Sequence, residues 1–163
     1  MPTADPDPKL KLRAADADDL VILSAQLQDA IVPVTDISFL AAERTFVMVV
    51  NRFMWNAVPA AIGVDASAAM GDGGPVFLRC NCGVRIGQVE RAQTQALDLR
   101  DRSTMLDLLS LRFEDGAILV TFSGAPELRL HVSDIEVVLE DFGEPWPTRR
   151  TPSHGLSDTE DHD

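Results

Sequence analysis

The stretch MLDLLSLRFEDGAILVTFSGAPELRLHV, residues 105–132, decides the fold class. Three of its segments alternate apolar and polar residues, which is the period of a half-buried strand: 105–114, 117–122 and 127–132. A DG dipeptide and then SGAP separate them, and both are turn signals. We therefore predict a three-stranded antiparallel meander, whose first strand carries Leu109, Leu111 and Phe113 on its apolar side.

The N-terminal part of the chain begins with helical spacing and then changes to strand spacing. DADDLVILSAQLQDA, residues 16–30, has apolar residues three and four apart, and Asp16 is a suitable N-cap. VPVTDISFL, residues 32–40, and TFVMVVNRFMW, residues 45–55, favour two strands joined by the turn AAER. We predict one helix followed by this strand pair.

The two cysteines lie in VFLRCNCGVRIGQVERAQ, residues 76–93, which we predict to be one strand. Cys80 and Cys82 fall in phase with its apolar residues, and free cysteine in such a position behaves as a small hydrophobe. A zinc site usually needs a second pair of ligands, which this stretch does not offer. We therefore predict that both cysteines fill the core.

The segment SDIEVVLEDFG, residues 133–143, carries both periods. Apolar residues fit a helical stripe, Ser133 and Glu136 have the spacing of a capping box, and Gly143 is placed to end a helix. The same residues also alternate as in a strand. We predict a short helix over 134–142, with a strand as the alternative, and attribute the adjacent acids Glu140 and Asp141 to a helix end and solvation.

The expected fold class is α+β, with an N-terminal helix, a mainly antiparallel sheet forming a small barrel or sandwich, and a short C-terminal helix. A pleckstrin-homology-like barrel with a terminal helix plugging one end fits this order of elements. Residues 10–150 are expected to form a single domain containing a flexible loop at 56–75. Residues 1–9 and the acidic residues 151–163 are expected to be disordered tails.

Charge and motifs narrow the classes of function. The formal net charge of −12 argues against a nucleic-acid or membrane binder. The start of the chain lacks the pattern of a secretory signal, and with two cysteines this favours a reducing cytoplasm. No metal-binding, cofactor-binding or catalytic motif is evident. We predict that His131, the histidine outside the acidic tail, is a surface residue.

Two groups of residues are candidate binding sites. Arg79, Arg85 and Arg91, with Asn81 between the first two, share one side of the predicted strand. Arginine concentrated on one face of an acidic protein is suited to an anion or an acidic partner. The second group, at the mouth of the 56–75 loop, consists of Asn51, Arg52 and Trp55.

Four stretches of the sequence resemble a family of bacterial proteins. They are LVILSAQLQDAIVPVTDISFL, NRFMW, LLSLRFEDGAILVTFSG and LRLHVSDIEVVLEDFGEPW. The family is typical of alphaproteobacteria and is catalogued as a domain of unknown function. The resemblance covers about residues 10–147 and implies a bacterial cytoplasmic protein, but it supplies no catalytic residues.

These observations support two hypotheses about function. The first is a non-catalytic cytoplasmic module that binds a partner protein through the arginine-bearing strand face. The alternative is a small-ligand binder or an enzyme of unfamiliar type, with a pocket under the 56–75 loop. Homodimerisation through a strand edge is compatible with the first hypothesis.

Overall fold

The computed structural model describes residues 9–54 and 77–148 of the 163-residue chain. Helix α1 (Ala17–Leu27) lies near the N-terminus, as predicted. Its cap is Asp16, whose carboxylate accepts a hydrogen bond of 2.8 Å from the backbone N–H of Asp19. No helix among the described residues is long and apolar enough to span a lipid bilayer.

The described residues also form ten strands, joined in one antiparallel sheet. Two 3-10 helices, η1 (Val34–Asp36) and η2 (Ala41–Glu43), flank β3, so the single strand predicted over 32–40 is divided by η1. The strands are β1 (Lys11–Ala14), β2 (Ile31–Pro33), β3 (Ile37–Leu40), β4 (Thr45–Phe53), β5 (Phe77–Ile86), β6 (Val89–Gln95), β7 (Met105–Glu114), β8 (Ala117–Phe122), β9 (Glu127–Val132) and β10 (Val137–Thr148).

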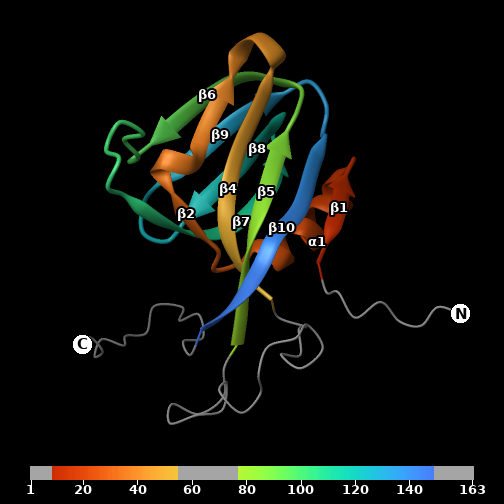
Figure 1. Ribbon diagram of the computed structural model, residues 1–163. Coiled ribbons are helices and arrows are strands. Elements are labelled where there is room, and N and C mark those ends of the chain that lie inside the picture. The colour runs from red at the N-terminus through yellow and green to blue at the C-terminus, as the bar shows by residue number, and fades with distance from the viewer. Residues whose placement is uncertain (1–8, 55–76, 149–163) are drawn as a thin grey trace, which may run out of the picture.

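The sheet is folded over into two layers and is not closed into a barrel. Its order is β1-β10-β5-β4-β2-β7-β8-β9-β6, with β3 paired to β4 beside this path. In Figure 1, β4, β5 and β10 form the near layer, while β7, β8 and β9 lie behind them. Helix α1 packs against β7 and β1, and its buried Leu20, Leu23 and Leu27 join the core between the layers. The expected barrel plugged by a terminal helix is therefore wrong.

The predicted meander is confirmed as β7, β8 and β9, but the buried side of β7 differs from the prediction. A register shift between Leu108 and Ser110 places a β-bulge at Leu109. Leu108 and Leu111 are 0% and 2% exposed, whereas Leu109 and Phe113 are 38% and 39% exposed. The extra residue reverses the alternation between Leu108 and Leu111, which strict period-two reasoning does not anticipate and which accounts for Leu109. Phe113 stays in phase with Leu111, and its exposure goes with its place next to the end of the strand at Glu114.

The cysteine-bearing segment forms two strands instead of one. The inward residues of β5 are buried as predicted, both free cysteines included: Leu78, Cys80, Cys82, Val84 and Ile86. The strand ends at Ile86, and Gln88 adopts a left-handed φ of 58°. Residues 89–95 then continue as β6, which pairs with β9. The chain thus leaves one part of the sheet and enters another within two residues.

The segment predicted as a C-terminal helix is part of strand β10, so the helix is a wrong prediction and the strand alternative is confirmed. β10 lies between β1 and β5 and forms a backbone ladder with each of them. Val137 and Leu139 face the core, and both are 0% exposed. Gly143, with a φ of 76°, lies where the pairing with β5 shifts register, instead of ending a helix. Two ladders and a buried face outweigh the local capping signals.

Candidate functional site

Two of the predicted arginines lie on the outer side of β5, the side away from the core. Arg79, Asn81 and Arg85 alternate there with the buried cysteines. Arg91 does not share this surface, because it lies on β6 opposite His131 of β9. Its guanidinium lies 3.3 Å from the His131 Nε2 atom. The structure therefore brings together three of the four residues predicted for this site.

The register between strands adds two cations that the sequence pattern did not indicate. Val138 of β10 lies between Arg85 of β5 and Arg13 of β1. Two residues further along the same pair of strands, Lys11 of β1 is opposite Glu140 of β10. We call the outer side of β1, β10, β5 and β4 the basic face; its cations are Lys11, Arg13, Arg79 and Arg85.

The exposed cations of the basic face differ from two arginines of the other layer in their ion pairing. Arg112 of β7 and Arg129 of β9 each lie near a glutamate of their own strand, at 3.8 and 4.0 Å. Within the described part of the chain, Lys11, Arg13 and Arg85 are exposed and form no ion pair. With Glu140 as the carboxylate opposite Lys11, the three exposed cations leave an excess of positive charge on this face of a protein of net charge −12.

The floor of the basic face is apolar and hollowed. Gly83 lies between Val49 of β4 and Glu140 of β10 and has no side chain to cover the sheet. A groove of about 310 Å³ lies over this position. It is lined by Val47, Met48, Val49, Gly83, Val84, Arg85, Val138, Glu140 and Phe142. Phe142 is 45% exposed at its margin, which is unusual for a phenylalanine side chain.

Arg79 is the most enclosed cation of the basic face. Its Nη1 donates a 3.1 Å hydrogen bond to the carbonyl of Asn51, and its Cζ lies 5.5 Å from the centre of the Phe53 ring. Burial lowers the pKa of Arg79 from its ordinary value, against the opposing effect of the carboxylates of Asp107 and Asp29. Arg79 therefore helps to hold β5 against β4, in addition to contributing charge.

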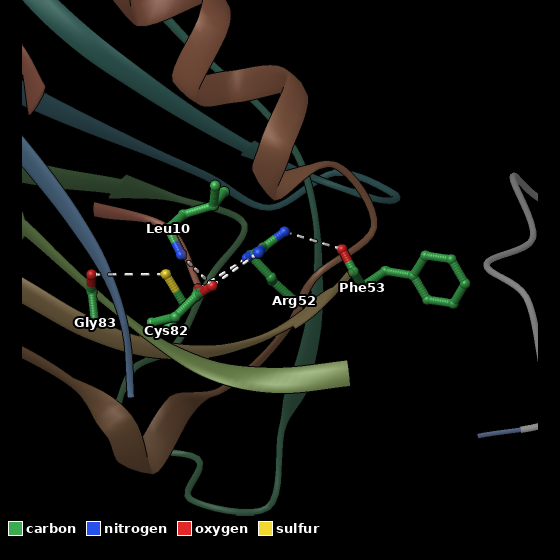
Figure 2. Close-up of polar contacts among 6 residues, drawn as sticks. Leu10, Arg52, Phe53, Cys82 and Gly83 are labelled. Carbon is green, nitrogen blue, oxygen red and sulfur yellow. Dashed lines mark hydrogen bonds and ion pairs between the residues drawn. The ribbon is translucent and has the colours of Figure 1, made fainter. Parts of the chain in front are cut away.

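Arg52, predicted to lie near a pocket, is instead buried in a bidentate ion pair with Asp141 of β10. Its Nε and Nη2 atoms each donate a 2.8 Å hydrogen bond to the carboxylate (Figure 2). Its Nη1 donates to the carbonyl of Phe53 at 3.2 Å. The Asp141 carboxylate also accepts a 2.8 Å hydrogen bond from the N–H of Leu10, just before β1. The attribution of Asp141 to a solvated helix end is therefore wrong, because the pair ties β4, β10 and the start of β1 together.

The surroundings of this ion pair set the pKa values of the nearby groups. Burial acts to raise the pKa of Asp141, but hydrogen bonds from Arg52 and Leu10 outweigh it and hold the pKa below its usual range. Burial also raises the pKa of the Cys80 thiol to about 12 and raises the pKa of Cys82. The cysteines are therefore protonated core residues at neutral pH, and not reactive thiolates.

The remaining predictions concern a pocket at the end of β4. Asn51 is half-buried on the outer side of that strand, opposite Asn81. Trp55 and the 56–75 loop lie outside the described residues, as do residues 1–8 and 151–163. Among the residues that are described, no three histidine, cysteine, aspartate or glutamate side chains are grouped to hold a metal ion.

Comparison with known proteins identifies a family. The family described as "Protein of unknown function (DUF2948)" matches residues 10–154. No curated protein and no solved structure matches the chain.

Proposed function

Because the chain belongs to the DUF2948 family, whose function is unknown, we propose a function from its geometry: a non-catalytic module that binds an anionic surface of a partner protein through the basic face. The observation that carries this proposal is the group of exposed cations at Lys11, Arg13 and Arg85, which form no ion pair with the described residues and outnumber the carboxylate of Glu140 beside them. Charge of this sign on a protein of net charge −12 steers an acidic partner to one face.

The apolar floor favours a protein as the partner. A nucleic acid is bound mainly by cations that follow its phosphates, and the overall negative charge of this chain opposes that. Protein interfaces instead combine an apolar centre with a charged rim, and arginine is enriched in them. The basic face has this composition, with valines and Phe142 around Gly83 and the cations on β1 and β5 beside them.

We place this module in the reducing cytoplasm of a bacterium. The two free, fully buried cysteines support this placement. A second function, binding of a small ligand beside Arg52, is less well supported, because that guanidinium is buried and each of its three nitrogens already donates to Asp141 or the Phe53 carbonyl.

The test is a comparison of two charge-reversed variants in affinity capture from a lysate of the source organism. The variant Arg13→Glu/Arg85→Glu alters the basic face, and Arg112→Glu/Arg129→Glu makes the same change of charge on the other layer. We leave Arg79 unchanged, because it packs on Phe53. Captured proteins are identified by mass spectrometry, after circular dichroism has established that both variants are folded.

Wild type and the Arg112→Glu/Arg129→Glu control should capture the same proteins, and Arg13→Glu/Arg85→Glu should lose them. Retention on wild type should also fall as salt is raised, since exposed charges are screened within about 10 Å at 0.1 M. Equal capture by all three proteins would refute a role for the basic face.

A further inference from the structure

The groove over Gly83 has the dimensions and position of a pocket for one side chain. Its volume of about 310 Å³ is at the lower end for ligand pockets, so it suits a side chain better than a cofactor. Its lining includes the aliphatic side chains of Val47, Val49 and Val138. A leucine, isoleucine or methionine side chain would cover apolar surface that the protein itself leaves exposed.

Cations lie along the side of this groove formed by the row of Arg13, Val138 and Arg85. Arg85 lines it directly, and Arg13 lies across Val138 from Arg85. Lys11 lies beyond Glu140, on the same outer side of the sheet. Carboxylates that flank an aliphatic residue in an extended segment would therefore meet cations while that residue enters the groove.

We propose that the groove over Gly83 binds one aliphatic side chain of an extended acidic segment of a partner protein, with the flanking carboxylates paired to Arg13 and Arg85. This inference rests on the proposed function and specifies its ligand. Charge complementarity requires the bound segment to be negatively charged. The absence of a side chain at Gly83 determines where its aliphatic residue is bound. The cations contribute most of the affinity for the segment, and the groove makes binding depend on the aliphatic residue in its sequence.

A substitution that fills the groove without altering its charge separates the contribution of the groove to binding from that of the cations. A Cβ atom at Gly83 would meet only the backbone oxygen of Glu140, at 3.9 Å, which is ordinary van der Waals contact. Gly83 lies within β5, where a β-branched residue is favoured. Gly83→Val should therefore fold, which circular dichroism and thermal unfolding would verify, while its side chain occupies the groove.

The experiment selects peptides from a displayed library of random ten-residue sequences on the full-length wild-type chain. We expect the enriched peptides to carry one leucine, isoleucine or methionine next to aspartate or glutamate. The most enriched peptide is then synthesised with a fluorescent label, and a second version is made with its aliphatic residue replaced by alanine. Fluorescence anisotropy gives the affinity of both peptides for wild type, Gly83→Val, Arg13→Glu/Arg85→Glu and Arg112→Glu/Arg129→Glu.

Wild type should bind the original peptide at least about fivefold more tightly than the alanine version, since burying a large aliphatic side chain even in part favours binding by that amount. Gly83→Val should lose this preference and keep the weaker affinity for the alanine peptide. Arg13→Glu/Arg85→Glu should bind both peptides at least about tenfold more weakly, because each contact between an arginine and a peptide carboxylate becomes a repulsion between two carboxylates. The Arg112→Glu/Arg129→Glu control should bind as wild type does.

Other outcomes would overturn the inference in distinguishable ways. Equal binding of both peptides to wild type, or an unchanged preference in Gly83→Val, would show that the groove is not the pocket. Failure to enrich any peptide, or enrichment of basic or purely polar ones, would exclude recognition of an acidic aliphatic segment. In either case the capture experiment above decides separately whether the basic face binds a partner.

Discussion

Removing the charge of Asp141 should destabilise the protein severely. Asp141→Asn preserves the shape of the side chain but leaves the Arg52 guanidinium buried without a counter-ion. The two side chains are 3% and 0% exposed, so water does not replace the lost partner. Removing one member of a buried pair costs about 3–5 kcal/mol of the free energy of unfolding. That is a large share of the roughly 5–15 kcal/mol typical of a domain.

The assay is urea unfolding followed by circular dichroism, and Asp98→Asn is the matched control. Arg100, the partner of Asp98, is 92% exposed in its side chain, so the control should lose far less stability than Asp141→Asn. Arg52→Met should cost about as much as Asp141→Asn. The double variant Arg52→Met/Asp141→Leu should cost less than the sum of the two single changes, because neither buried charge remains. Losses below about 1 kcal/mol in both single variants would refute the buried ion pair.

The same pair predicts a dependence on pH. Burial would raise the pKa of Asp141, but the hydrogen bonds from Arg52 and Leu10 hold it below the usual range. The carboxylate of an unfolded chain has a pKa of about 3.9, so Asp141 stabilises the fold fully above that pH and progressively less as pH falls through the folded-state pKa. The difference in stability between wild type and Asp141→Asn should therefore be constant above about pH 5 and shrink in acid.

Two further predictions concern the core. Leu108→Ala should cost about 2–5 kcal/mol of the free energy of unfolding, because Leu108 is fully buried. Leu109→Ala should cost less than about 1 kcal/mol, because the bulge leaves Leu109 38% exposed. A larger loss in Leu109→Ala than in Leu108→Ala, measured by urea unfolding, would contradict the bulge. Cys80 and Cys82 should resist iodoacetamide at pH 8 in the folded protein and react after unfolding in urea, since both are 0% exposed and burial raises their pKa values, that of Cys80 to about 12. Mass spectrometry measures the labelling, and rapid modification of the folded chain would show that the thiols are accessible.

Part of the candidate site followed from the sequence alone. Arg79, Asn81 and Arg85 are separated by two and four residues, and even spacings place residues on the same side of any strand through them. Arg91 was wrongly grouped with them, because the left-handed residue Gln88 ends the strand, and glutamine is not a strong signal for such a conformation. The other cations of the basic face were missed, since β1 joins β5 only through β10, from the opposite end of the chain.

The buried ion pair shows the same limit. Arg52 and Asp141 lie 89 residues apart in the sequence, so no local pattern indicates that they pair. Asp141 follows another acid, which is usually a sign of solvation. The only local indication is that it continues the alternation of Val137 and Leu139, both of which face the core. That alternation indicates that Asp141 is buried only if the segment is already known to be a strand.

The sequence by itself determined the features that depend on local periodicity: the N-terminal helix with its cap, the meander over 105–132, and the burial of both cysteines. Tertiary structure decided the segment 133–143, which carries both periods and became a strand because β1 and β5 offer a backbone ladder on each side. It also decided the basic face and the Arg52–Asp141 pair. The reason is physical: the alternation of side chains is a property of adjacent residues, whereas strand pairing and the choice of a counter-ion join residues from distant parts of the chain.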